Sequence, residues 1–356
     1  MADKASPLMR LLAGKTTVDH LQGEEMSLLW AEARACGLLG RVAHTLTNSR
    51  QSNADVSPFR DQLLAANTHS HGFRQDVRRE LGHIERALSG LQAPVILLKG
   101  ASYVLLGLPT AYGRVFSDID ILVAREQIAN AEAALMLGGW STGKLSAYDH
   151  RYYRQWSHEI PPMTHLQRGT TIDLHHSLVM PTCRVRVDSS RMIAAAMPAR
   201  ADGFWWRLQD EDMVLHAASH LILNSEFDRG LRDLWDIDVL LRHFASMRPD
   251  FPDRLRARAQ EVGLEQVLLQ VLWLASRFFG TPLPRNAANV KSSMFLQWVS
   301  LAAATRHPDT RPWGQHGADF ALMLREMYLR LPNKLLAIHL GHKLSNLFSS
   351  GGKEMV

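Results

Sequence analysis

Apolar residues recur three or four positions apart through much of the first 90 residues of this chain. This helical spacing is clear over residues 28–39 and again over residues 59–91. Polar and turn-forming residues from 48 to 58 separate the two stretches, and Pro58 stands where a helix can begin. The pattern therefore predicts a helical N-terminal region over residues 1–90.

From residue 91 to residue 200 the pattern changes to short apolar runs separated by helices. One run ends at Lys99 and Gly100, which predicts a buried strand that leads directly into a helix. Residues 140–179 hold several strand-like pieces, of which the last is the clearest. Strands are expected over residues 94–98, 117–123 and 170–175, with helices over residues 101–108 and 126–137.

The chain beyond residue 210 returns to helical spacing. Helices are expected over residues 213–223, 231–244, 264–279 and 295–304, with a basic amphipathic end over residues 335–348. We expect that end to be a docked helix with a solvated face, the alternative being contact with RNA or a membrane surface. The whole pattern predicts an α+β protein with three regions: a helical N-terminal region (1–90), a sheet-containing core (91–200) and a helical C-terminal domain (201–356).

Charge and cysteine content narrow the class of protein. The formal net charge is +5 and the isoelectric point is about 9.3, which favours phosphate-bearing partners. Cys36 and Cys183 are too few for a disulfide framework, and free thiols suit a reducing cytoplasm. The first residues lack an apolar signal core, and no stretch approaches the ~18 consecutive apolar residues of a membrane span. We therefore expect a soluble, cytoplasmic protein with no membrane span.

Two carboxylates stand two residues apart in the strand expected over residues 117–123. Such positions share a face of a strand, so Asp118 and Asp120 project together while Ile119 and Ile121 face the opposite way. Like charges this close repel each other unless a cation lies between them, and all-oxygen ligation suits Mg²⁺. The pair therefore predicts a metal site for phosphate chemistry, the alternative being the solvated face of an edge strand.

A third carboxylate would turn this pair into a larger site. Strand alternation puts Asp173 and His175 on one face, with Ile172 and Leu174 on the other, so Asp173 joins the pair if the two strands are neighbours. Three carboxylates can hold two divalent ions, of which one orients a triphosphate and the other activates an attacking hydroxyl. The alternative is a single acid on a half-exposed strand.

The turn from the first strand into its helix offers groups that bind phosphate. Free N–H groups at a helix start favour anions, Gly100 permits close approach, and Ser102 offers a hydroxyl. Lys99 and Arg114 add two cations, and Arg114 is capable of bidentate contact with phosphate oxygens. The alternative for the glycine turn is a simple tight connection from strand to helix. The alternative for Lys99 and Arg114 is that each is a structural counter-ion to the acidic cluster.

Together these residues resemble the uncharacterised bacterial nucleotidyltransferase family of the DNA polymerase beta-like superfamily. The resemblance rests on Lys99, Gly100, Ser102, Arg114, the run from Ser117 to Val123, and the run from Ile172 to His175. It implies a small mixed sheet flanked by helices, two Mg²⁺ ions, with Mn²⁺ as a substitute, and transfer of a nucleoside monophosphate from an NTP with release of pyrophosphate.

The motif match also implies a role for each of these residues. Asp118, Asp120 and Asp173 correspond to the catalytic metal carboxylates. Gly100 and Ser102 correspond to the triphosphate turn, and Lys99, Arg114 and Ser117 are assigned to nucleotide binding with them. The turn departs from the common superfamily pattern, because Ala101 separates its glycine from its serine. The expected NTP is ATP.

The acceptor of the nucleotide is open at this point. We expect a hydroxyl or phosphate on a small molecule, a glycan precursor or a peptide. The alternatives are toxin-like transfer to an RNA end or a protein side chain, which the basic isoelectric point favours only mildly, and a non-catalytic nucleotide-binding module that keeps the fold. Three retained carboxylates argue against the last alternative, because a binding module has no need of clustered like charges.

The histidines suggest further roles. His216, His220 and Asn224 recur every four residues on one expected helix and therefore share a face. This stripe supports the structure, lines the pocket or, on a weak signal, binds a metal. His175 lies near Asp173 and is suited to deprotonating an acceptor, the alternative being a strand-end hydrogen bond.

Overall fold

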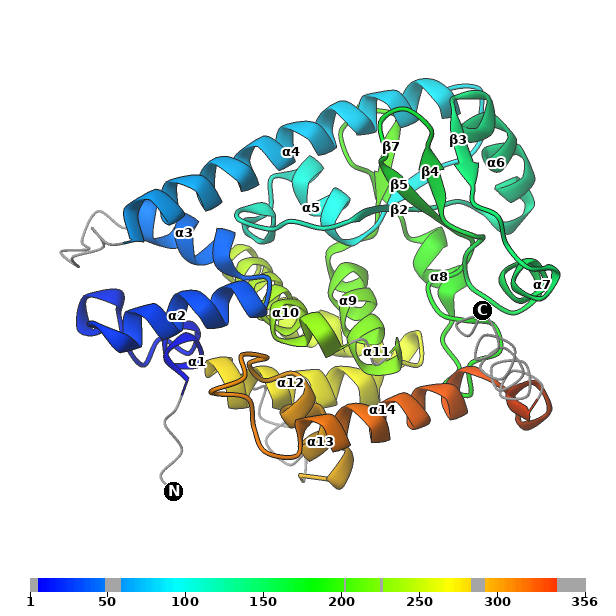
Figure 1. The fold of residues 1–356 in the computed structure, drawn as a ribbon. Coiled ribbons are helices and arrows are strands. Elements are labelled where there is room, and N and C mark those ends of the chain that lie inside the picture. Colours follow the sequence, from blue (N-terminus) through cyan, green and yellow to red (C-terminus); the bar gives the residue numbers. More distant parts are fainter. Residues whose placement is uncertain (1–5, 49–58, 202, 225–226, 283–291, 338–356) are drawn as a thin grey trace, which may run out of the picture.

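The structure is a computed structural model that describes residues 6–48, 59–201, 203–224, 227–282 and 292–337 (Figure 1). The chain starts with helices, as its apolar spacing predicts. They are α1 (Pro7–Leu12), the 3₁₀ turn η1 (Val18–His20), α2 (Glu24–Ala35), α3 (Leu39–Asn48) and α4 (Arg60–Leu88). The predicted link over residues 48–58 lies outside the described residues from residue 49 onward.

The helical spacing over residues 28–39 is divided between α2 and α3. Helix α2 ends at Ala35, and Gly37 then has a φ of 67°. Glycine adopts this left-handed conformation at helix ends without the steric penalty of a side chain. The apolar pattern continues through the turn because Cys36 and Leu38 are both buried. The predicted helical character of this stretch is therefore present on both sides of a turn at residues 36–37.

A mixed sheet of seven strands forms the centre of the chain. The strands are β1 (Val95–Leu97), β2 (Asp118–Leu122), β3 (Trp140–Thr142), β4 (Met163–His165), β5 (Thr171–His175), β6 (Met197–Pro198) and β7 (Trp205–Arg207). Their order is β3-β4-β5-β2-β1-β7-β6, with β2–β5 and β1–β7 parallel and the other pairs antiparallel. The predicted α+β class and the mixed sheet are confirmed, although β6 and β7 have no predicted counterpart.

Strand β2 occupies the middle of this sheet. It is hydrogen-bonded to β5 on one side and to β1 on the other. Its backbone groups are therefore paired on both sides, and Ile119, Ile121 and Leu122 are buried. The alternative placed Asp118 and Asp120 on an edge strand, and this is wrong because β2 lies between two other strands.

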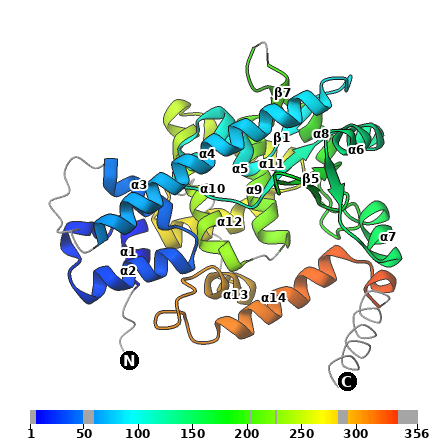
Figure 2. The ribbon, with the colours of Figure 1, turned by 45° about the horizontal axis from the view of Figure 1, so that its top comes forward.

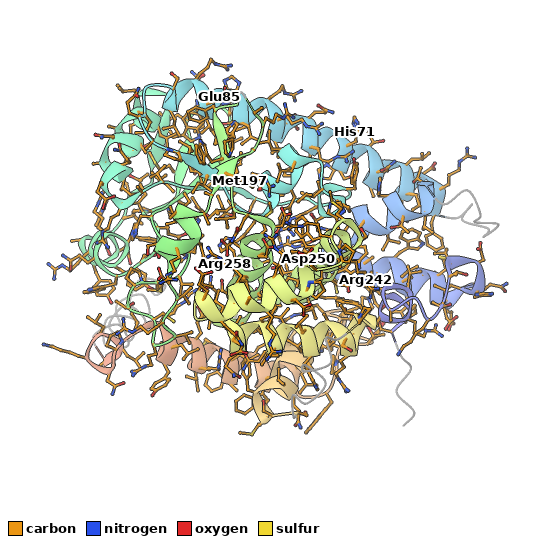
Figure 3. All side chains as sticks on the ribbon, turned by 180° about the vertical axis from the view of Figure 1, so that it is seen from behind. His71, Glu85, Met197, Arg242, Asp250 and Arg258 are labelled. Carbon is orange, nitrogen blue, oxygen red and sulfur yellow. The ribbon has the colours of Figure 1, made fainter. Side chains whose placement is uncertain are left out.

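Helices cover the sheet on the side of α4. Helix α4 packs along α5 (Lys99–Leu106) and α6 (Ile128–Leu137), as Figure 1 shows. The outward-facing side chains of α4 include His71 and Glu85, which point away from the sheet (Figure 3). The remaining elements of this region are the 3₁₀ turns η3 (Pro109–Ala111) and η4 (Arg125–Gln127) and the helices α7 (Ala147–Gln155) and α8 (Ser189–Ala194). The predicted helices after β1 and β2 are thus confirmed, with α5 starting two residues early.

The C-terminal region is helical, as its spacing predicts. It contains α9 (Asp210–Asn224), the 3₁₀ turn η5 (Phe227–Arg229), α10 (Gly230–Met247), α11 (Phe251–Glu261), α12 (Glu265–Phe279), α13 (Met294–Ala302) and α14 (Gln315–Arg330). Helix α11 has no predicted counterpart because only Phe251, Leu255 and Ala259 bury an apolar face. Helix α14 likewise buries only a narrow stripe. The predicted basic end over residues 335–348 lies outside the described residues from residue 338 onward.

The hydrophobic core is continuous across the three predicted regions. Leu29 of α2, Ile121 of β2 and Leu234 of α10 belong to the same cluster of buried side chains. Helices α4 and α14 lie on opposite sides of the protein, with α9 and α10 between them (Figure 2). The predicted domain boundaries at residues 90 and 200 stay predictions. In the described ranges, no helix has both the length and the apolar character needed to cross a membrane.

Candidate functional site

The predicted third carboxylate joins the pair because β2 and β5 are neighbours. The two strands are parallel, and Asp120 lies directly opposite Asp173 in their register, while Asp118 lies opposite Thr171. Neighbouring strands are about 4.8 Å apart, so side chains at matched positions on one face are adjacent. The apolar residues that alternate with these acids, Ile119 and Ile172, are buried on the opposite face.

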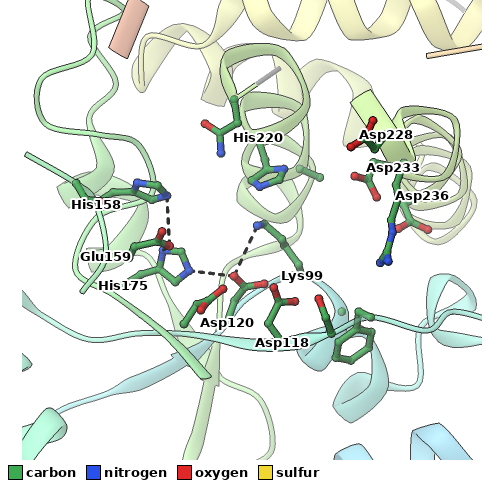
Figure 4. Close-up of a pocket in the computed structure, with 18 of the residues that line it drawn as sticks. Lys99, Asp118, Asp120, His158, Glu159, His175, His220, Asp228, Asp233 and Asp236 are labelled. Carbon is green, nitrogen blue, oxygen red and sulfur yellow. Dashed lines mark hydrogen bonds and ion pairs between the residues drawn. The ribbon is translucent and has the colours of Figure 1, made fainter. Parts of the chain in front are cut away.

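These carboxylates line a pocket of about 550 Å³ between the sheet and the C-terminal helices (Figure 4). This volume is typical of sites that enclose a small molecule. The pocket is strongly charged, with groups of both signs. Its walls include Lys99 of α5, Tyr152 and Tyr153 of α7, His220 of α9, Asp233 and Asp236 of α10, and Arg330 of α14.

Asp120 contacts the ammonium group of Lys99 and the imidazole of His175. Its Oδ1 lies 3.7 Å from Nζ of Lys99 and accepts a hydrogen bond of 3.0 Å from Nε2 of His175. Burial alone would raise the pKa of Asp120, but the Lys99 ammonium and the His175 hydrogen bond outweigh it and hold the pKa well below its usual range. Asp120 is therefore ionised at any physiological pH.

Asp173 has the opposite electrostatic environment. Burial, together with the nearby carboxylates of Asp120, Glu159 and Asp118, raises its pKa to about 8. Its Oδ1 is buried and has no hydrogen-bond partner among the described residues. An orphan carboxylate oxygen beside two further acids is a donor set that a hard divalent cation fits. Asp118, Asp120 and Asp173 are thus the residues that could hold Mg²⁺.

The first residues of α5 place Lys99 and Gly100 at the pocket, but Ser102 is not among the residues that line it. Lys99 has a φ of 39°, which is rare for a residue other than glycine and is typical of strained functional sites. A Cβ atom on Gly100 would lie 2.7 Å from the ring of Phe116. Glycine is therefore required here by that ring. Ser102 is buried, is not among the pocket-lining residues, and its Oγ has no hydrogen-bond partner among the described residues.

Arg114 lines the pocket and forms ion pairs with α10. It contacts Asp236, and its Nη1 lies 3.8 Å from Oδ1 of Asp233. Asp236 also forms an ion pair with Arg41 of α3. These groups are nearly fully buried, and burial lowers the pKa of Arg114 to about 10. Within the described ranges the ion pairs of Arg114 are with these two acids, so it is a counter-ion to α10 instead of to Asp118 or Asp120.

Ser117 and the predicted histidine stripe also have clear positions. Ser117 is exposed at the pocket, immediately before β2. His220 and Asn224 line the pocket, whereas His216 lies deeper in α9, where burial lowers its pKa to about 3. Both His216 and His220 are therefore neutral, since burial also lowers the pKa of His220. In the described part of the chain, neither belongs to a group of three or more metal-ligating side chains.

A second polar cluster in the pocket escaped sequence reasoning. His158 and Glu159 precede β4, and an isolated bridge pairs Glu159 with His175 at the end of β5. Burial alone would lower the pKa of His175, but its hydrogen bond to Asp120 and the charge of Glu159 raise it. The adjacent pair of His158 and Glu159 in the sequence was the available signal, but its approach to β5 depends on a non-local contact.

One comparison with known proteins identifies a family. The family model described as "Uncharacterised nucleotidyltransferase" matches residues 22–280, a span that runs from the start of α2 through α12 and includes every residue of the predicted motifs. The chain therefore belongs to this family of nucleotidyltransferases, for which an NTP is a substrate. No curated protein matches the chain.

Proposed function

We propose that this protein is a nucleotidyltransferase of the DNA polymerase beta-like type that requires divalent metal. It transfers a nucleoside monophosphate from an NTP, with ATP as the expected donor, to a hydroxyl or phosphate of a small-molecule, glycan or peptide acceptor. The observation that carries the proposal is the pairing of Asp120 with Asp173 across β2 and β5, with Asp118 on the same face. This is the arrangement that two-metal phosphoryl transfer needs.

The chain supplies a ligand set and an anion site in one pocket. Asp118, Asp120 and Asp173 would hold two Mg²⁺ ions, which when bound neutralise the triphosphate and increase the acidity of the acceptor hydroxyl. Lys99 contributes an ammonium group beside Asp120, and the first N–H groups of α5 favour phosphate oxygens. We assign Gly100 and Ser117 to the same nucleotide contact because both line the pocket.

Arg114 and Ser102 have weaker support as nucleotide contacts. The guanidinium of Arg114 is engaged with Asp236, so its first role is to hold α10 against the loop that leads into β2. Ser102 would reach a phosphate only through a shift of the turn, because it is buried and is not among the residues that line the pocket. Both assignments stay predictions.

In the proposed reaction the acceptor oxygen forms a bond to the α-phosphorus of the NTP as the bond to the leaving oxygen breaks. Pyrophosphate leaves with the β- and γ-phosphates, and the acceptor proton passes to a base or to water. The pocket residues bind, orient and neutralise charge in this step. The toxin-like alternative with an RNA or protein acceptor and the non-catalytic alternative stay predictions.

Label transfer from an NTP tests the proposal. The wild-type protein is incubated with each α-³²P-labelled NTP, Mg²⁺ and a cell extract, and the small-molecule, RNA and protein fractions are then counted. Label should enter one fraction with the wild type and none with Asp118→Asn, which removes a carboxylate and keeps the side-chain shape. His71→Gln, a change at an exposed position on α4, is the matched control and should transfer label as the wild type does. Equal transfer by Asp118→Asn would overturn the proposal.

A further inference from the structure

His158, Glu159 and His175 form a cluster of metal-ligating groups beside the carboxylates of the proposed nucleotidyl site. One ligand atom from each lies within 4.8 Å of the others. Oε2 of Glu159 is 3.5 Å from Nδ1 of His175 and 3.8 Å from Nε2 of His158. Ligands of a tetrahedral ion with bonds of about 2.0–2.1 Å are roughly 3.3 Å apart, so only small side-chain movements would bring these atoms into coordination.

The backbone holds this cluster in place. The N–H groups of His176 and Ser177 both donate to the carbonyl of His158, and the N–H of Ile160 donates to the carbonyl of Leu174. These bonds fix the segment of His158 and Glu159 against the end of β5. The cluster is therefore preorganised, since its two halves are joined by backbone hydrogen bonds on both sides of the ligating residues.

The hydrogen bond of His175 determines which of its nitrogens is free. Nε2 donates to the ionised Asp120, so Nδ1 faces Glu159 and has no hydrogen-bond partner in the described part of the chain. Two lone pairs would face each other there unless a cation, either a proton or a metal ion, lies between them. A ligating imidazole commonly donates its other N–H to a carboxylate, which is the arrangement of His175 with Asp120.

We infer that His158, Glu159 and His175 bind one Zn²⁺ ion, distinct from the Mg²⁺ held by the three aspartates. Two imidazoles and one carboxylate suit zinc, whereas Mg²⁺ prefers oxygen ligands and keeps several waters. All three residues line the pocket, so a water or a substrate oxygen in the pocket would complete the coordination of the ion. Three protein ligands with one open position are the pattern of a zinc site that receives a substrate oxygen or water.

The shared imidazole links the zinc site to the nucleotidyl site. His175 ligates zinc through Nδ1 and orients Asp120 through Nε2, so each site influences the geometry of the other. Asp120 is then a positioning residue for zinc, and removing its carboxylate should weaken zinc binding about 10–100-fold without abolishing it. Asp118 is not a member of the zinc cluster, so its removal should leave zinc affinity unchanged.

Zinc binding to the full chain tests the inference without any nucleotide. Protein treated with chelator and then dialysed is titrated with Zn²⁺ against a chromogenic chelator, and bound metal is counted by mass spectrometry. We expect one Zn²⁺ per chain, retained in excess Mg²⁺, and a Co²⁺ form with the absorption of a tetrahedral site. Glu159→Gln and His158→Gln, checked for folding by circular dichroism, should lose affinity by more than 100-fold.

Two control variants separate this site from other sources of binding. His71→Gln removes an exposed histidine of α4, and Asp118→Asn removes a carboxylate of the proposed Mg²⁺ site, so both should bind zinc as the wild type does. Unchanged affinity in Glu159→Gln and His158→Gln would overturn the inference, because the zinc would then be adventitious. Absence of bound zinc in the wild type at neutral pH would overturn it too, and would leave a proton between Glu159 and His175.

Discussion

Asp120 and Asp173 lie opposite each other on β2 and β5, yet their pKa values are shifted in opposite directions. The pKa of Asp120 is lowered because Lys99 and His175 outweigh its burial, whereas burial and neighbouring acids raise that of Asp173 to about 8. One carboxyl group therefore stays ionised while its neighbour retains a proton near neutral pH. Opposite shifts of the two pKa values are expected where two carboxyl groups are adjacent and the nearby positive charge is too small to keep both ionised.

The metal-free protein should lose stability from Asp173 as the pH rises. Its folded pKa of about 8 is above the ordinary value of about 3.9. The folded state therefore binds the proton more tightly than the unfolded state, and this contribution is complete below about pH 4 and lost as the pH rises through about 8. Asp173→Asn is neutral throughout and lacks this dependence.

Urea unfolding of both proteins in EDTA, at several pH values from 5 to 9, measures this effect. The free energy of unfolding of the wild type, relative to that of Asp173→Asn, should fall from pH 5 to about pH 8 and level off above it. A difference that is constant or rises with pH would show that Asp173 does not hold its proton in the folded protein.

Asp236 should be a major determinant of stability, because it pairs with both Arg41 and Arg114 in the interior. Asp236→Asn leaves these two buried guanidinium groups without their shared charge, and we expect a loss of about 3–5 kcal/mol in the free energy of unfolding. Asp228→Asn is the matched control. The Asp228 side chain is fully exposed and its ion pair with Arg306 is long, so its removal should change the urea midpoint little. Similar midpoints for the two variants would contradict the buried network.

Gly100→Ala should destabilise the protein even though alanine favours helices. Alanine gains at most about 1 kcal/mol over glycine within a helix. The added Cβ would lie 2.7 Å from the ring of Phe116, and such overpacking costs about 1–3 kcal/mol, so the steric effect should prevail. Thermal unfolding of Gly100→Ala, Phe116→Leu and the double variant checks this. The double variant should be more stable than the sum of the single changes predicts, and strict additivity would argue against the contact.

Local patterns in the sequence predicted which acidic side chains share a strand face. Spacing by two places Asp118 and Asp120 on one face of β2, and the same rule places Asp173 and His175 on one face of β5. Whether these strands are neighbours depends on pairing between segments more than 50 residues apart, which a local pattern leaves open. The resemblance to a known family supplied that pairing as an expectation, and the register of β2 and β5 agrees with it.

Residues whose role comes from distant packing were not predictable in this way. Arg114 has the chemistry of a phosphate ligand, but its partner Asp236 lies on α10, over 100 residues further along the chain. Gly100 was expected to admit a phosphate, whereas the ring of Phe116 occupies the space beside it. His158 and Glu159 reach His175 only because the segment before β4 is hydrogen-bonded to β5. Each of these contacts is set by the tertiary fold.

Calorimetry of ATP binding tests the central claim most directly, because it requires no knowledge of the acceptor. If Asp118, Asp120 and Asp173 hold the metal that meets the triphosphate, the wild type should bind ATP in Mg²⁺ or Mn²⁺ and lose that binding in EDTA. Asp118→Asn should fail to bind in Mg²⁺ while melting at or above the wild-type temperature. Equal ATP affinity in Mg²⁺ and in EDTA, or wild-type affinity in Asp118→Asn, would contradict the account.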